Sequence, residues 1–600
     1  MRSLTELTFR LRQELANAAL AVIQPGLGDV EIPTPLPGLP EPCAVAARLQ
    51  GTPYARQVVE LAQQIVTGQL PVLGLRLDIG KDIRWRKDYV GGIETHPVYF
   101  RRIPYLDPSL TGDHKIIWEM SRHQHLVLLA QAYLIEQLPE YLTEIQRQLE
   151  NWMDANPFQR GINWTSALEV GFRALSWIWI YHFIGGEWTT AFRRRFLNAL
   201  NQHGLYLEYN LSVYFSPNTH LLGEALALYA LGRLMPQLPR ARSWEETGAS
   251  WVRREMGNQV LEDGAHFEQS AYYHVYATDM FLFFASLAKP DSAYLQRLAR
   301  MADYLDHLMG PSRILPLFGD DDGGRMFHPY GTRTEFGRGT LAACSAFLNG
   351  GQYLGAREDL YPMAAWWLGP RVFDLAETPP RTFVSTLFPQ TGMASLFQAN
   401  CQALMDVGEF GALTAGHSHA DTLSLIIRRG AEEILIDPGS YTYMGDPVWR
   451  NHFRGSAFHN TVTIDGLHQG EFGGPFSWLS RPSALLISFE PTMVQASCSF
   501  SGFTHRRTVT FEDPSLLTVV DEISGPPGKH LVAWFWHFGI PAGEAQRIIR
   551  LDPGLKVTWE EGGQYGWRSP ALGIREPAPV AVAQVETELP CRHETEFHLG

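Results

Sequence analysis

The residues best suited to chemistry lie in one stretch, residues 416–443. His417 and His419 precede an aliphatic run, the chain turns at residues 428–430, and a second aliphatic run leads to Asp437. This pattern predicts two β-strands joined by a short turn. Side chains two apart on a strand share a face, so His417 and His419 would point the same way if the strand extends to them. Asp437, at the end of the returning strand, could close on them.

A third histidine, His459, begins another alternating run, in His459-Asn460-Thr461-Val462. Imidazoles and a carboxylate from several strand ends form a ligand set that suits zinc. The alternative is that these are ordinary polar residues at strand ends. The repetition of the pattern at three strand edges favours the metal site.

A second candidate lies at the start of a predicted helix, in Ser216-Pro217-Asn218-Thr219-His220. The first turn of a helix has unpaired backbone donors and a positive dipole end. Both oppose protonation of His220 and favour an anion beside it. Alternatively, Asn218 only caps the helix and His220 is exposed.

Residues 262–276 place Glu268, Tyr272, Tyr273 and Tyr276 in a loop that leads into a helix. Tyrosines one helical turn apart lie on nearby faces. An aromatic stripe is usually part of a core, but this one is polar and follows Asp-Gly, which is more typical of a cleft edge.

Two further motifs carry charge. Residues 318–325 form an acidic loop whose spacing does not match a helix-loop-helix calcium site, so a hydrogen-bonded turn is the simpler interpretation. Arg450 and Arg454 precede His459 and could pair either with a substrate carboxylate or with nearby aspartates.

Composition narrows the class of protein. A net charge of −14 argues against a nucleic-acid or membrane-surface binder. The five cysteines lack metal spacing and indicate free thiols. The N-terminal segment lacks the features of a secretory signal and no stretch is suited to span a membrane, so we expect a soluble protein, cytoplasmic or periplasmic. The oligomeric state is left open.

The elements that must position these residues change in type along the chain. Residues 1–45 predict a helix followed by a Pro/Gly-rich linker or extended cover. Residues 46–380 are dominated by apolar residues at helical spacing with short breaks, which predicts stacked helical hairpins. Residues 381–600 contain many short strands separated by turns, typical of an antiparallel β-sandwich. The cleft between two such domains is a preferred place for a ligand.

The chain resembles the heparinase II/III-like polysaccharide lyases, which include related alginate lyases. The matching motifs run in order over most of the chain: Trp118 to Arg122, Asn163-Trp164 with Arg173, Asn218-x-His220, Asp263-Gly264 with Glu268 and Tyr273-His274, Gly319-Asp320, His417-x-His419, Asp437-Pro438-Gly439 and His459-Asn460-Thr461. One position departs from the family, because Thr219 stands directly before the histidine where Asn is common.

The resemblance implies an incomplete (α/α) toroid followed by an antiparallel β-sandwich, with β-elimination at a uronic acid of an anionic glycan. It implies that Asn218 and His220 neutralise the substrate carboxylate, that Tyr273 transfers a proton and that His417 assists. It assigns structural zinc to His419, Asp437 and His459. We also expect substrate contacts from Arg122, Arg173, Glu268, Arg450 and Arg454.

The chemistry sets one condition. Tyrosine ordinarily titrates near pH ~10, so it acts as a base only if a neighbouring cation lowers its pKa. Two rival functions are an inverting glycoside hydrolase using Glu268 and Asp320, and a non-catalytic glycan-binding protein.

Overall fold

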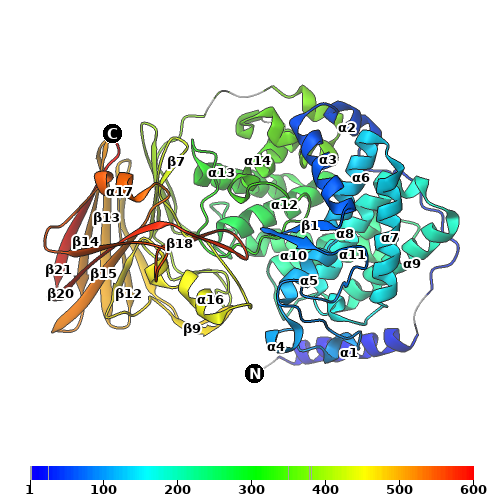
Figure 1. Cartoon of the computed structure of the whole chain (residues 1–600), viewed down its shortest axis with the longest axis horizontal. Coiled ribbons are helices and arrows are strands. Elements are labelled where there is room, and N and C mark those ends of the chain that lie inside the picture. Colours follow the sequence, from blue (N-terminus) through cyan, green and yellow to red (C-terminus); the bar gives the residue numbers. More distant parts are fainter. Residues whose placement is uncertain (1–2, 24–25, 349–350, 377–378, 380) are drawn as a thin grey trace.

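The computed structural model describes the whole chain except residues 1–2, 24–25, 349–350, 377–378 and 380. A helical domain and a β domain lie side by side (Figure 1). The last helix of the helical domain, α15, ends at Leu368, and the first strand of the β domain, β3, begins at Thr386. The predicted order of fold types is confirmed.

The N-terminal helix α1 (Leu4–Val22) lies along the lower edge of the helical domain in Figure 1. The chain that follows is an extended cover: Leu27, Ile32 and Leu36 are buried in the helical core. The Pro/Gly-rich segment is therefore packed against the domain over the part the structure describes.

The helical domain is built from hairpins whose inner helices are neighbours in a ring. The inner helices α6, α8, α10, α12 and α14 contact one another in that order, and α7, α9, α11 and α13 pack outside them. Every residue of α8 is buried, as expected for a helix covered on all sides. The helices are α2 (Pro42–Leu49), α3 (Pro53–Val66), α4 (Pro108–Thr111), α5 (His114–Ser121), α6 (Gln124–Glu136), α7 (Pro139–Ala155), α8 (Ala167–Ile184), α9 (Thr190–Asn210), α10 (Thr219–Leu234), α11 (Ala241–Gln259), α12 (Ala271–Ala288), α13 (Ser292–Met309), α14 (Phe336–Phe347) and α15 (Ala364–Leu368), with one hairpin of β1 (Gln69–Val72) and β2 (Leu75–Asp78).

The β domain contains three larger sheets, all antiparallel. Their strand orders are β3-β4-β5-β6-β7, β17-β20-β15-β8 and β11-β12-β13-β14-β21-β16. The bounds are β3 (Thr386–Phe388), β4 (Met393–Gln398), β5 (Cys401–Asp406), β6 (Leu425–Arg429), β7 (Glu432–Leu435), α16 (Pro447–Phe453), β8 (Val462–Ile464), β9 (Glu471–Gly474), β10 (Ser477–Ser480), β11 (Ser483–Glu490), β12 (Met493–Phe500), β13 (Phe503–Asp513), β14 (Leu516–Ser524), β15 (Lys529–His537), α17 (Ala542–Ile548), β16 (Ile549–Leu551), β17 (Lys556–Glu561), β18 (Trp567–Ala571), β19 (Ile574–Pro577), β20 (Pro579–Glu588) and β21 (Cys591–His598).

One apolar core fills the space between these sheets. Alternating residues such as Val509 on β13, Leu517 on β14 and Trp536 on β15 are buried in it. A bridge between Leu435 and Phe538 joins the five-stranded and four-stranded sheets into one layer. The predicted β-sandwich is confirmed.

The predicted hairpin is present as β6 and β7, with one correction. β6 begins at Leu425, so His417 and His419 lie in the preceding loop and not on the strand. Their common direction comes from a shared hydrogen-bond partner, described below. No helix in the described residues is long and apolar enough to cross a bilayer.

Candidate active site

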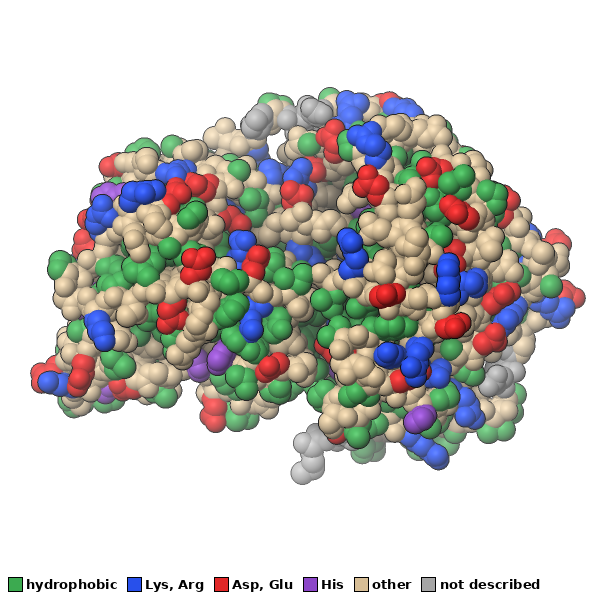
Figure 2. All heavy atoms as spheres, in the orientation of Figure 1, with side chains coloured by type: hydrophobic (Ala, Val, Ile, Leu, Met, Phe, Trp, Pro, Cys, Tyr) green, Lys and Arg blue, Asp and Glu red, His purple; other side chains and the backbone are tan. Residues whose placement is uncertain are grey.

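A cleft of about 480 Å³ lies between the two domains, and Figure 2 shows the furrow that separates them. The helical domain contributes Asn218, His220, Glu268 and Tyr273 to its lining. The β domain contributes His417. The structure thus brings together, at a domain boundary, five residues predicted to act on or bind a substrate.

Tyr273 of the helical domain and His417 of the β domain contact each other across this cleft. Their rings are stacked, with centroids 4.0 Å apart and planes inclined by 22°. Tyr443 of the β domain also lines the cleft, and its hydroxyl lies 3.4 Å from the Tyr273 hydroxyl. Tyr272 turns away: its hydroxyl accepts a hydrogen bond from Arg333 at 3.0 Å, and it is not among the described residues lining the cleft.

Asp320 holds the β-domain histidines in place from the helical domain. It is fully buried and bonds His417 Nδ1 and His419 Nε2, each at 3.0 Å. Arg450 pairs with both of its oxygens, and Ser440 Oγ donates to it at 3.2 Å. Because Asp320 is enclosed and is not among the described cleft-lining residues, it does not suit the role of hydrolase carboxylate that the sequence allowed.

Glu268 organises the start of α10. Its carboxylate accepts from Asn218 Nδ2 at 2.6 Å and from Thr219 Oγ1 at 2.8 Å. Asn218 lines the cleft and caps α10, whereas Thr219 is fully buried. The departure at Thr219 therefore leaves an amide facing the cleft, one residue earlier in the chain.

The pKa of Tyr273 differs from the value that a tyrosine base requires. Burial, followed by the negative charge of Asp322 and the proximity of Tyr443 and Glu268, raises the pKa of Tyr273 well above its ordinary value. The condition set for a tyrosine base, a pKa lowered by a neighbouring cation, is therefore not met in this structure. Tyr273 is a protonated phenol here, which suits a proton donor.

The histidines of the cleft differ from each other. Burial disfavours protonation of His417, but the hydrogen bond to Asp320 and the charge of Glu268 outweigh it and raise its pKa. Burial lowers the pKa of His220 to about 4, so that imidazole is neutral near pH 7. Its place at the first turn of α10 agrees with the sequence-based expectation.

Three of the four predicted substrate-binding arginines lie outside the cleft lining. Arg173 is buried between Trp152 and Trp164 in the helical core. Arg450 is held by Asp320, which is the alternative the sequence left open. Arg454 donates to Asn451 and stacks on Phe472 and Trp478. All three engage protein groups and are absent from the described cleft lining, so the structure does not place them where the sequence predicted substrate contacts.

Arg122 does line the cleft, as part of a buried charge network. It forms two 2.7 Å hydrogen bonds with Glu169 and contacts Glu119 at 2.9 Å. Lys115 beside it pairs with Asp322 at 2.9 Å and with Glu119 at 3.1 Å. Each of these cations already has carboxylate partners before any substrate binds.

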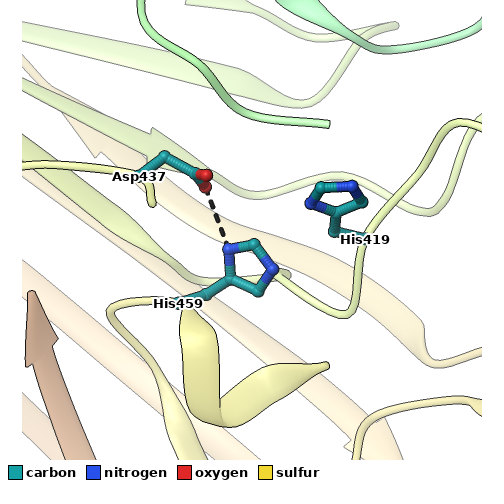
Figure 3. Close-up of side chains that lie close together, drawn as sticks. All are labelled: His419, Asp437 and His459. Atoms are coloured by element: carbon teal, nitrogen blue, oxygen red, sulfur yellow. Dashed lines mark hydrogen bonds and ion pairs between the residues drawn. The ribbon is translucent and has the colours of Figure 1, made fainter. Parts of the chain in front are cut away.

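The predicted metal ligands lie together (Figure 3), and one of them, His419, shares Asp320 with the cleft residue His417. Ligand atoms of His419, Asp437 and His459 all lie within 4.8 Å of one another, and the three residues are buried. Asp437 accepts from His459 Nδ1 at 2.9 Å. His419 Nδ1 and His459 Nε2 are buried without a hydrogen-bond partner. Two orphaned imidazole nitrogens beside a carboxylate fit a zinc ion, since a buried polar atom is costly without a partner.

Sequence reasoning missed Tyr443 and the central role of Asp320. Tyr443 follows the Asp437-Pro438-Gly439 motif closely, and that position was the only signal available. Asp320 was considered as a loop residue, a family-motif residue and a hydrolase carboxylate, but not as the partner of His417 and Arg450, which lie about a hundred or more residues away in the chain.

Comparison with known proteins agrees with this arrangement. Residues 68–328 match the family model "Heparinase II/III N-terminus" and residues 380–588 match "Heparinase II/III-like, C-terminal". The chain is 22% identical over 491 residues to a heparin-sulfate lyase of Bacteroides stercoris, covering 75% of this chain and 67% of that protein. It is 24% identical over 485 residues to a heparin-sulfate lyase of Pedobacter heparinus, covering 76% of this chain and 64% of that protein.

A solved heparinase III structure shares the fold, with a TM-score of 0.68, 16% identity and coverage of 98% of this chain and 90% of that one. The helical domain followed by a β-sandwich is the fold that this chain shares with that structure. Because the two family models together match most of the chain, it belongs to the heparinase II/III-like family.

Proposed function

We propose that this protein is a polysaccharide lyase that cleaves a uronate-containing glycan by β-elimination. The observation that carries the proposal is the stacked pair of Tyr273 and His417 in the interdomain cleft. It puts a phenol and an imidazole, both able to move protons, side by side where a glycan can enter. The relatives named heparin-sulfate lyases support a glycosaminoglycan as the substrate class.

Elimination needs a base and an acid, and the two rings divide these roles. His417 is oriented by Asp320 through Nδ1, so its Nε2 is the base that removes the C5 proton. The C4–O4 bond then breaks as the C4–C5 double bond forms. Tyr273, protonated in the free enzyme, gives its proton to the departing O4, and Tyr443 lies within reach to share the hydrogen bond.

Removal of the C5 proton builds negative charge on the uronate carboxylate, which must meet donors already in place. Asn218 and the neutral His220 are the donors at the first turn of α10, where the helix dipole adds to their effect. Glu268 is the third member of this group. It accepts the hydrogen bond of Asn218 Nδ2 at 2.6 Å and so fixes that amide at the start of α10.

We assign zinc to His419, Asp437 and His459 in a bracing role. These residues are buried and are not among the described lining residues of the cleft. When bound, zinc would supply the positive charge that fixes the loop carrying His417. The proton transfers are carried by the protein's own side chains.

The charge of the cleft favours a weakly sulfated substrate. Of the cations that line the cleft, Lys115 and Arg122 are paired with Asp322, Glu119 and Glu169. A sulfate at either of these two would have to displace a carboxylate, whereas one uronate carboxylate can be met by Asn218 and His220.

The test is ultraviolet absorbance of the purified protein with alginate, hyaluronan, chondroitin, heparan sulfate and unsulfated heparosan. A new C4–C5 double bond absorbs in this band, so a rise on a uronate polymer is expected, and the weakly sulfated members should be preferred. Absence of a rise on every polymer, with the protein folded and metal bound, would overturn the proposal.

A further inference from the structure

The N-terminal helix contributes to the cleft although it lies outside both family-matched segments. Phe9, Arg10 and Gln13 of α1 line the same cleft as Tyr273 and His417. The family match begins only at residue 68. This part of the cleft is therefore supplied by a segment outside the sequence matched by the two family models.

α1 is held in one position by a buried amide cluster. Asn17 and Asn210 exchange two hydrogen bonds of 2.9 Å, and Gln159 donates to Asn17 at 3.0 Å. Asn17 is fully buried. Glu14 pairs with Arg101 at 2.9 Å on the surface above the cluster. Side chains on the inner face of α1 are thus presented to the cleft from a fixed backbone.

Opposite α1, the loop between α9 and α10 supplies two aromatic rings. Phe9 contacts Tyr214 edge to face, with centroids 5.3 Å apart. Phe215 also lines the cleft and is 66% exposed. An exposed phenyl ring at a cleft wall is an apolar surface without a protein partner, and aromatic rings suit the apolar face of a pyranose.

Two guanidinium groups, those of Arg10 and Arg101, line the same cleft as these rings. Arg10 donates through Nε to Glu6 at 2.8 Å, and Arg101 donates through Nη2 to Asn210 at 3.4 Å. Both side chains are about one third exposed, at 34% and 36%. A guanidinium has five N–H donors in a fixed fork, so each can still bind a carboxylate.

We propose that these residues form a second sugar subsite, which binds another uronate of the glycan, one disaccharide repeat away from the uronate that reacts at Tyr273. The subsite consists of Phe9, Arg10, Gln13, Arg101, Tyr214 and Phe215. In this subsite the ring of Phe215 packs against the apolar face of the sugar, and Arg10 and Arg101 bind its carboxylate. The choice of a uronate glycan as the ligand rests on the proposed function. The subsite itself is tested by binding, which does not require turnover.

The experiment measures binding by calorimetry in the Tyr273→Phe background, so that no probe is consumed. The probes are disaccharides and tetrasaccharides of unsulfated heparosan, hyaluronan, chondroitin and alginate. At least one tetrasaccharide should bind more tightly than its disaccharide. Phe215→Ala should raise the Kd of that tetrasaccharide about tenfold and leave the Kd of the disaccharide unchanged.

The matched control is Leu11→Ala on the outer face of α1, where the side chain is 61% exposed and is not among the described cleft residues. It should change neither Kd. The proposal is overturned if no tetrasaccharide binds better than its disaccharide, or if Phe215→Ala affects both lengths equally or neither. Length-dependent binding that Phe215→Ala abolishes, with no elimination by the wild type, would support the subsite while contradicting the lyase.

Discussion

The imidazole of His417 lies flat against the phenol ring of Tyr273, with ring centroids 4.0 Å apart. One ring belongs to the β domain and the other to the helical domain, and 144 residues separate them in the chain. The reactive pair therefore exists only when the two domains are docked. Asp320 strengthens this dependence, because it reaches from the helical domain to His417 and His419 of the β domain.

Tyr273→Phe removes the proposed acid without removing the ring that stacks on His417. We expect turnover to fall by about 10²–10⁴-fold with little change in melting temperature. The control is Tyr272→Phe, whose hydroxyl bonds Arg333 outside the described cleft lining. That variant should keep its activity and lose about 1 kcal/mol of stability. Equal activity of the two variants would contradict the assignment.

Asp320→Asn tests the group that orients His417. An amide cannot neutralise Arg450 or accept hydrogen bonds from both histidines, so we expect turnover to fall ~100-fold or more. Breaking a buried ion pair also costs about 3–5 kcal/mol, so rates are compared below the melting temperature of each variant.

Asp279→Asn is the matched control for that experiment. Asp279 is equally buried and pairs with Arg325 at 2.9 Å inside the helical domain. Asp279→Asn should lower the free energy of unfolding by about as much as Asp320→Asn does. It should leave the turnover per folded molecule unchanged. A similar loss of turnover in both variants would show that Asp320 acts only through stability.

The metal cluster can be tested without measuring activity. Elemental analysis should find about one zinc per chain, and Asp437→Asn should lose it because the anionic ligand is gone. A chelator should lower the melting temperature of the wild type and not that of Asp437→Asn, since bound metal stabilises the folded state. His505→Gln, at a buried histidine that bonds Asp521 in the same domain, should retain zinc. Full zinc occupancy in Asp437→Asn would refute the ligand assignment.

Glu224 predicts how stability depends on pH. It is buried beside Ser212, and burial raises its pKa to about 8, against the hydrogen bonds from Ser212 that lower it. Between about pH 4.5 and 8 the folded protein retains this proton and the unfolded chain releases it. The contribution of Glu224 to stability is therefore full below the unfolded pKa and declines as pH rises, by up to about 1.4 kcal/mol per pH unit.

The Glu224→Gln variant has no carboxyl group to ionise at this position, so it lacks the pH-dependent loss of stability. The melting temperature of this variant should fall less than that of the wild type between pH 5 and pH 8. Glu246→Gln is the control, because Glu246 is exposed and pairs with Arg242 on the same helix. Parallel curves for the wild type and Glu224→Gln would mean that Glu224 is ionised in the folded protein at neutral pH.

Much of the fold could be predicted because its pattern is local. An inner helix such as α8 is mostly apolar and is buried on all faces, and β14 alternates buried and partly buried positions from Leu516 to Glu522. The candidate metal ligands were identified because each stands beside a strand end. The grouping of His220, Tyr273 and His417 came from the family resemblance.

The sequence could not tell a cation that awaits a ligand from one that already has a partner. Arg173 lies between two tryptophans of the core. Arg450 forms an ion pair with Asp320, which is 130 residues away in the chain. Nor could it give the pKa of Tyr273, because that value depends on burial and on Asp322 and Glu268, which only the folded chain brings near.

The central claim is elimination at the Tyr273–His417 pair, and the most direct test counts two products in the same sample. Ultraviolet absorbance counts new C4–C5 double bonds, and a reducing-sugar assay counts cleaved glycosidic bonds, with weakly sulfated uronate polymer as substrate. We predict one double bond for each new reducing end with the wild type, and neither product with Tyr273→Phe. Reducing ends that appear without double bonds would mean hydrolysis and would contradict the proposed function.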